Sequence, residues 1–114
     1  MSDARAVRAL GPWQLGTSDV FLIAQRENIV YRVERKTGPP LALRLHRPGY
    51  QSREMILSEL TWMAHLFDNG IPVPKPIATP DDQNLVEIDG HFVDLLTWLD
   101  GTPIGSTGTP LNLN

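Results

Sequence analysis

The sequence predicts an α+β fold in which a five-stranded antiparallel sheet packs against one long helix. Three strand-like stretches within residues 20–46 follow one another through short turns, which favours antiparallel neighbours. Residues 53–69 then change to a helical period. Two further strand-like stretches, 85–88 and 91–98, flank an Asp-Gly turn, which is a strong hairpin signal. One sheet covered by the helix is the simplest packing of these elements.

The ends of the chain are expected to lie outside the main domain. Residues 3–10 have helical composition, and Gly11-Pro12 ends that helix, so we expect residues 1–11 to be a peripheral helical extension. The main domain is expected to span residues 12–101. Residues 102–114 are rich in Gly, Thr and Pro, and we interpret them as a linker toward a C-terminal lobe beyond this sequence.

The first three strands are expected at residues 20–25, 29–34 and 41–46. In the second and third strands, apolar and polar side chains alternate, which is the pattern of a strand with two different faces. The odd-numbered positions of both are apolar. Ala42 and Arg44 share the opposite face of the third strand.

The helix is expected over residues 53–69, with Ser52 as its N-cap and Glu54 in the first turn, where the helix dipole favours a negative charge. Gly70 ends the helix, and the prolines that follow prevent its continuation. Its apolar stripe consists of residues spaced by three or four positions: Ile56, Leu60, Met63 and Phe67.

Composition argues against several functional classes. The net charge of the 114 residues is −3, so there is no basic surplus for binding nucleic acid. Cysteine is absent, which excludes a disulfide framework and a thiolate metal site. No apolar run approaches the roughly 20 residues of a membrane helix, and the N-terminus lacks the pattern of a signal peptide. We therefore expect a cytoplasmic protein that binds neither nucleic acid nor membranes.

The clearest functional signal is a pair of opposite charges. Glu59 lies three residues after Ile56 and four before Met63, so it projects from the helix face that should be buried. A carboxylate there is costly unless it is paired. Arg44 lies on the strand face that carries Ala42, and kinases hold ATP phosphates with such a strand cation and helix acid. The alternative is that Glu59 is a rim residue, because charges often border an apolar face.

Four segments carry a resemblance to a known family: ENIVYRV (27–33), LALRLHRPGY (41–50), SELTWMAHLFDNGIPVPKPI (58–77) and DGHFVDLLTWLDGTPIG (89–105). The GIPVP phrase after the helix and the WLDG phrase after the last strand are the most characteristic. Residues 19–105, roughly three quarters of the chain, resemble the N-terminal lobe of the aminoglycoside phosphotransferase and choline kinase superfamily. The resemblance is strongest to bacterial homoserine kinases of the second type.

The resemblance implies an ATP site on this lobe. Arg44 stands where the family usually has a lysine that touches the α/β-phosphates, and Glu59 stands where the helix acid orients that cation. Ala42 would form part of the roof over adenine, and Leu96 would lie at the back of the adenine pocket. Asn28 belongs to the turn that replaces a glycine-rich phosphate loop.

The resemblance also implies a hinge after the last strand. Thr97 and Leu99 would present a backbone C=O and N–H to the edge of adenine, and the side chain of Trp98 should point away from that edge. Mg²⁺ would accompany ATP. The sequence has no H-x-D-x-x-x-x-N motif, so the catalytic residues and the metal ligands are expected on the C-terminal lobe rather than in this chain.

One departure from the family concerns Arg44 itself. A guanidinium is a planar fork rather than a point charge, although it can bind phosphate oxygens bidentately.

Three functions therefore stay open: the ATP-binding lobe of a kinase for a small hydroxyl compound such as homoserine, choline or an aminoglycoside; a pseudokinase-type module without catalysis; and an unrelated interaction domain. In a kinase lobe, the sheet face that meets the second lobe would be exposed, which would favour a dimer.

Overall fold

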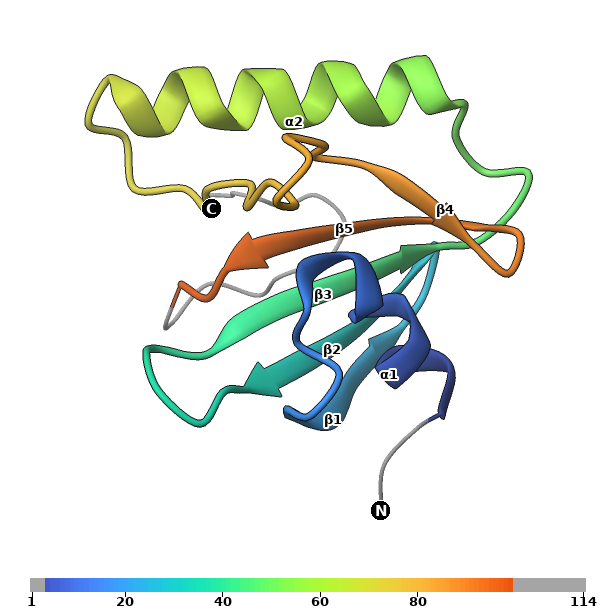
Figure 1. Ribbon diagram of the computed structural model, residues 1–114. Coiled ribbons are helices and arrows are strands. Elements are labelled where there is room, and N and C mark those ends of the chain that lie inside the picture. Colours follow the sequence, from blue (N-terminus) through green and yellow to red (C-terminus); the bar gives the residue numbers. More distant parts are fainter. Residues whose placement is uncertain (1–3, 100–114) are drawn as a thin grey trace.

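The computed structural model describes residues 4–99, and its elements follow the predicted order (Figure 1). A five-stranded antiparallel sheet and one long helix confirm the predicted α+β class. The interpreted linker at 102–114 lies outside the described residues. The elements are α1 (Ala4–Ala9), the 3-10 turn η1 (Gly11–Trp13), β1 (Asp19–Gln25), β2 (Asn28–Glu34), β3 (Leu41–His46), α2 (Arg53–Asp68), β4 (Val86–Ile88) and β5 (His91–Thr97).

The strands lie in the order β1-β2-β3-β5-β4, and all neighbours are antiparallel. Three hairpins account for most of this order, and α2 connects β3 to β4. The predicted turn between β4 and β5 is present, with positive φ at both Asp89 (52°) and Gly90 (83°). β5 lies directly beside β3, and all six residues of β3 are buried.

One face of the sheet packs against the N-terminal segment. Leu41, Leu43 and Leu45 of β3 belong to a core cluster that also contains the buried Leu10 and Trp13. Residues 4–11 are therefore not peripheral as expected, because Ala6, Ala9 and Leu10 are buried in this core. The small and apolar residues of α1 and η1 cover this face, as Figure 1 shows for α1 in front of the strands.

The opposite face packs against α2. Ser52 caps the helix as predicted, because its hydroxyl accepts a hydrogen bond from the Met55 N–H at 3.2 Å. Ile56 and Leu60 are the buried residues of α2, and they contact a smaller cluster that includes Ala42 and Leu96. The predicted stripe is only partly correct, because its last member, Phe67, is 42% exposed.

Exposure differs between the strands of the sheet. The central strand β3 is buried on both faces by the N-terminal segment and α2, so it does not form the exposed face expected of a lobe without its second lobe. Large exposed apolar side chains lie instead on the edge strand β1, at residues 21–23, and on the outer side of α2, at Trp62. Among residues 4–99, no helix has the length and apolar character needed to span a bilayer.

Candidate functional site

The predicted site residues gather on the sheet face that α2 covers. Residues directly opposite each other in antiparallel strands point to the same face, and so do alternate residues of one strand. The register thus aligns three rows across β2, β3 and β5: Asn28, His46 and Phe92; Val30, Arg44 and Asp94; and Arg32, Ala42 and Leu96.

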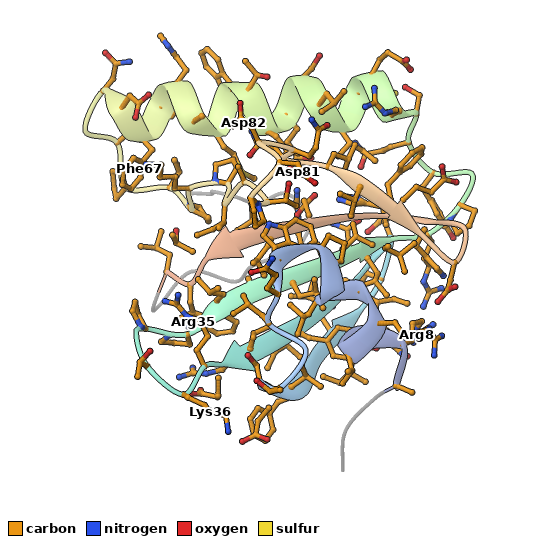
Figure 2. All side chains as sticks on the ribbon, viewed as in Figure 1. Arg8, Arg35, Lys36, Phe67, Asp81 and Asp82 are labelled. Atoms are coloured by element: carbon orange, nitrogen blue, oxygen red, sulfur yellow. The ribbon has the colours of Figure 1, made fainter. Side chains whose placement is uncertain are left out.

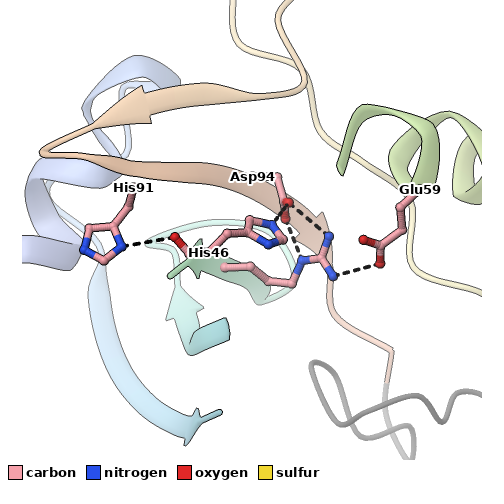
Figure 3. Close-up of polar contacts among 5 residues, drawn as sticks. His46, Glu59, His91 and Asp94 are labelled. Atoms are coloured by element: carbon pink, nitrogen blue, oxygen red, sulfur yellow. Dashed lines mark hydrogen bonds and ion pairs between the residues drawn. The ribbon is translucent and has the colours of Figure 1, made fainter. Parts of the chain in front are cut away.

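Arg44 lies at the centre of these rows and contacts two carboxylates (Figure 3). Its Nη1 donates to Glu59 Oε2 at 3.1 Å, which is the contact from sheet to helix that the sequence predicts. Its Nε and Nη2 donate to the two oxygens of Asp94 at 2.8 and 3.0 Å. Arg44 and Asp94 are both buried, so this bidentate pair is the stronger of the two interactions.

His46 extends the cluster on the far side of Asp94. Its Nε2 lies 2.6 Å from Asp94 Oδ2, and the ring is buried. An ionised carboxylate accepts hydrogen bonds only, so Nε2 carries the hydrogen of this bond. The other ring nitrogen, Nδ1, is buried and has no hydrogen-bond partner within residues 4–99. The ring thus acts as a donor to Asp94.

The electrostatic interactions within the cluster keep both Arg44 and Asp94 ionised. Burial alone would raise the pKa of Asp94, but the charge of Arg44 and the hydrogen bond from His46 outweigh it and lower this pKa. Burial alone would likewise lower the pKa of Arg44, but Asp94, and to a lesser extent Glu59, raise it above its usual value. Arg44 is thus charged at neutral pH.

This lowered pKa predicts acid sensitivity. Because the pKa of Asp94 is lower in the folded than in the unfolded chain, its ionised form contributes stability above about pH 4, the usual value for aspartate, and this contribution is lost as the pH falls further. We expect the difference in free energy of unfolding between wild type and Asp94→Asn to shrink below that pH. Urea titrations of both proteins between neutral and acidic pH measure it, and a constant difference would contradict the prediction.

The residues predicted to surround adenine lie at one end of the same face. Ala42 and Leu96 are buried opposite each other, and Leu99 packs against their cluster. Trp98 also packs against this cluster, and the Arg32 guanidinium lies 4.9 Å from its ring centre, an arrangement that favours a cation–π contact. Its orientation relative to the edge of adenine stays a prediction.

Thr97 differs from the other predicted residues. It is opposite Leu41, whose side chain belongs to the core on the α1 side of the sheet. Its N–H donates to the Lys75 carbonyl at 2.9 Å, and its hydroxyl accepts from the Lys75 N–H at 2.8 Å. Thr97 thus joins β5 to the segment after α2, and only its carbonyl is left for the predicted hinge role.

Sequence reasoning missed Asp94 and His46 as members of the cluster. A usable signal existed, because Asp94 is two residues before Leu96 just as Arg44 is two residues after Ala42. If the two strands pair so that Ala42 lies opposite Leu96, antiparallel geometry places Arg44 opposite Asp94, as observed.

The chain is similar in structure to solved small-molecule kinases. A microcompartment-associated aminopropanol kinase is 27% identical with a TM-score of 0.75, covering 87% of this chain and 32% of that protein. An amicoumacin kinase, solved in complex with AMP-PNP, Ca²⁺ and Ami, is 26% identical with a TM-score of 0.65, covering 75% of this chain and 27% of that protein. No family model matches the sequence, and no curated protein matches it.

A third structure shares the fold alone. It is a spectinomycin phosphotransferase in complex with ADP and spectinomycin, 16% identical with a TM-score of 0.52, covering 81% of this chain and 26% of that protein. The first two confirm the predicted resemblance to the N-terminal lobe of the aminoglycoside phosphotransferase and choline kinase superfamily, and the third agrees with them in fold. The homoserine kinase-like subtype stays a prediction. The chain spans about a third or less of the length of each of these proteins.

Proposed function

We propose that this chain is the ATP-binding lobe of a phosphotransferase that moves the γ-phosphoryl group of ATP to a hydroxyl group of a small molecule. The observation that carries this proposal is the 3.1 Å contact between Arg44 on the sheet and Glu59 on the helix, within a kinase-like lobe. Solved neighbours that carry nucleotide together with a small-molecule substrate support both ligand classes.

Different residues would contact different parts of ATP. Arg44 would donate hydrogen bonds to phosphate oxygens, and Ala42, Leu96 and Leu99 would supply an apolar surface to adenine. Mg²⁺ would neutralise part of the phosphate charge. The resemblance places the metal ligands on the C-terminal lobe, and residues 4–99 contain no group of three or more His, Asp or Glu side chains that could hold a metal ion.

Nucleotide binding can be tested on the chain itself. We expect millimolar ATP to shift the backbone amide resonances of Ala42, Arg44, Leu96 and Leu99, because these residues line the predicted site. Ala6 belongs to the core on the other face of the sheet and serves as an internal control. An ¹H–¹⁵N titration measures both sets, and unchanged resonances at the four site residues would overturn the proposal.

A pseudokinase-type module is the second candidate, and the charge around Arg44 favours it. Two carboxylates face this one guanidinium, so a phosphate group meets a site that is already occupied by anions. Turnover of ATP by the longer gene product with homoserine, choline and aminoglycosides separates the candidates. Phosphorylated product supports the kinase, and ATP binding without product supports the module. The acceptor, a cytoplasmic location and a dimer stay predictions.

A further inference from the structure

We propose that Asp94 is the residue that positions Arg44 and that Glu59 is an exchangeable anion, whose place on Arg44 Nη1 a nucleotide phosphate takes. This inference rests on the proposed function and changes the roles within it, because the family resemblance assigns the orienting role to Glu59. It follows from the unequal way in which the two carboxylates are held.

The Asp94 carboxylate is fully buried and accepts three hydrogen bonds. It accepts two hydrogen bonds from Arg44, which fix both the position and the plane of the guanidinium. It accepts a third hydrogen bond from His46 at 2.6 Å. Its side chain is 0% exposed, and it lies opposite Arg44 in the β3–β5 ladder, so the backbone itself sets the distance between the two residues.

Glu59 is held far more loosely. It makes one hydrogen bond to Arg44, at 3.1 Å, and its side chain is 37% exposed. It comes from α2 rather than from the sheet. Solvent can therefore hydrate the Glu59 carboxylate when it leaves Arg44. The buried Asp94 carboxylate, in contrast, would keep only its hydrogen bond with His46 if Arg44 moved away.

The balance of charge makes exchange the favourable way to admit a phosphate. Arg44 contributes one positive charge and the two carboxylates contribute two negative charges. A phosphate that approached with Glu59 in place would meet a site that is already anionic, and like charges at contact repel. Departure of Glu59 leaves a neutral Arg44–Asp94 pair, and the Arg44 Nη1 that donated to Glu59 can then donate to the incoming anion.

The positioning role is tested first, without any ligand. In the ¹⁵N-labelled chain, we expect the Arg44 Nε–H resonance to be protected from solvent exchange because it donates to buried Asp94. Protection should persist in Glu59→Gln and be lost in Asp94→Asn. Should Asp94→Asn fold poorly, His46→Phe retains Asp94 but removes its third hydrogen bond, because phenylalanine has no side-chain donor, and should weaken the protection. Loss of protection in Glu59→Gln alone would overturn the positioning role of Asp94.

The exchange is then tested by titrating ATP and inorganic triphosphate. We expect Glu59→Gln to bind both about threefold to tenfold more tightly, because a competing charge is removed. We expect Asp94→Asn to bind them about tenfold or more weakly, because its guanidinium turns to pair with Glu59 alone. Asp89→Asn is the matched control, since it removes the carboxylate from the exposed Arg8–Asp89 ion pair away from the site and should leave the affinity for both ligands unchanged.

The outcomes separate this inference from the proposed function. Weaker binding by Glu59→Gln would overturn the exchange while leaving an ATP-binding lobe. Absence of ATP binding to every form, wild type included, would overturn the proposed function and the exchange together. The comparison of Arg44 Nε–H protection decides the role of Asp94 in either case.

Discussion

Replacement of Asp94 by asparagine is expected to lower the free energy of unfolding at neutral pH by about 3–5 kcal/mol, because it leaves the buried Arg44 charge without its main partner. Asparagine keeps the size of the side chain, so the loss reports charge rather than a cavity. Urea denaturation followed by circular dichroism measures the difference, with unchanged m-values required for a two-state comparison.

Glu59→Gln provides the contrast for this prediction. Glu59 is more than a third exposed and makes a single bond to Arg44, so its replacement should cost about 0–1 kcal/mol, the usual range for such ion pairs. Equal losses in the two variants would show that the two carboxylates hold Arg44 equally, contrary to the geometry.

Leu10→Ala is expected to lower the free energy of unfolding by about 2–5 kcal/mol, the range for a buried leucine. Leu10 follows α1 and belongs to the core cluster beneath β3, so the N-terminal segment should behave as an integral part of the domain. Urea denaturation measures this loss of stability. Leu43→Ala in the middle of β3 gives the loss expected at a position in the centre of the core.

Arg8→Ala is the matched surface variant in the same segment. Arg8 and Asp89 form an ion pair whose side chains are both about half exposed, so we expect a loss of less than about 1 kcal/mol. Figure 2 shows Arg8 at the outer side of α1. A negligible effect of Leu10→Ala, similar to that of Arg8→Ala, would mean that the segment is dispensable.

Most of the fold could be predicted because local signals agree with the tertiary structure. Alternating side chains mark β2 and β3, and the Asp89-Gly90 turn marks the last hairpin. The position of the N-terminal segment could not be predicted. A helix of six residues has too short a pattern to reveal which surface it covers, and its burial depends on the sheet face that it meets.

The site was predicted in part for a related reason. The contact between Arg44 and Glu59 follows from the strand pattern and the helix period, both of which are local. The contact between Arg44 and Asp94 depends on the register of two strands that are 50 residues apart in sequence, and local patterns do not set that register. His46 was missed with it, because its role is defined only by its contact with Asp94.

The two acids that hold Arg44 belong to different parts of the lobe. Asp94 shares the sheet with Arg44, whereas Glu59 belongs to a helix that has only two buried residues, Ile56 and Leu60. A shift or rotation of this helix would lengthen the outer contact and leave the inner one intact. No isolated charge would then be stranded in the interior, so the electrostatic cost of moving the helix is small. The position of the cation beneath the helix is thus set by the sheet and not by the helix.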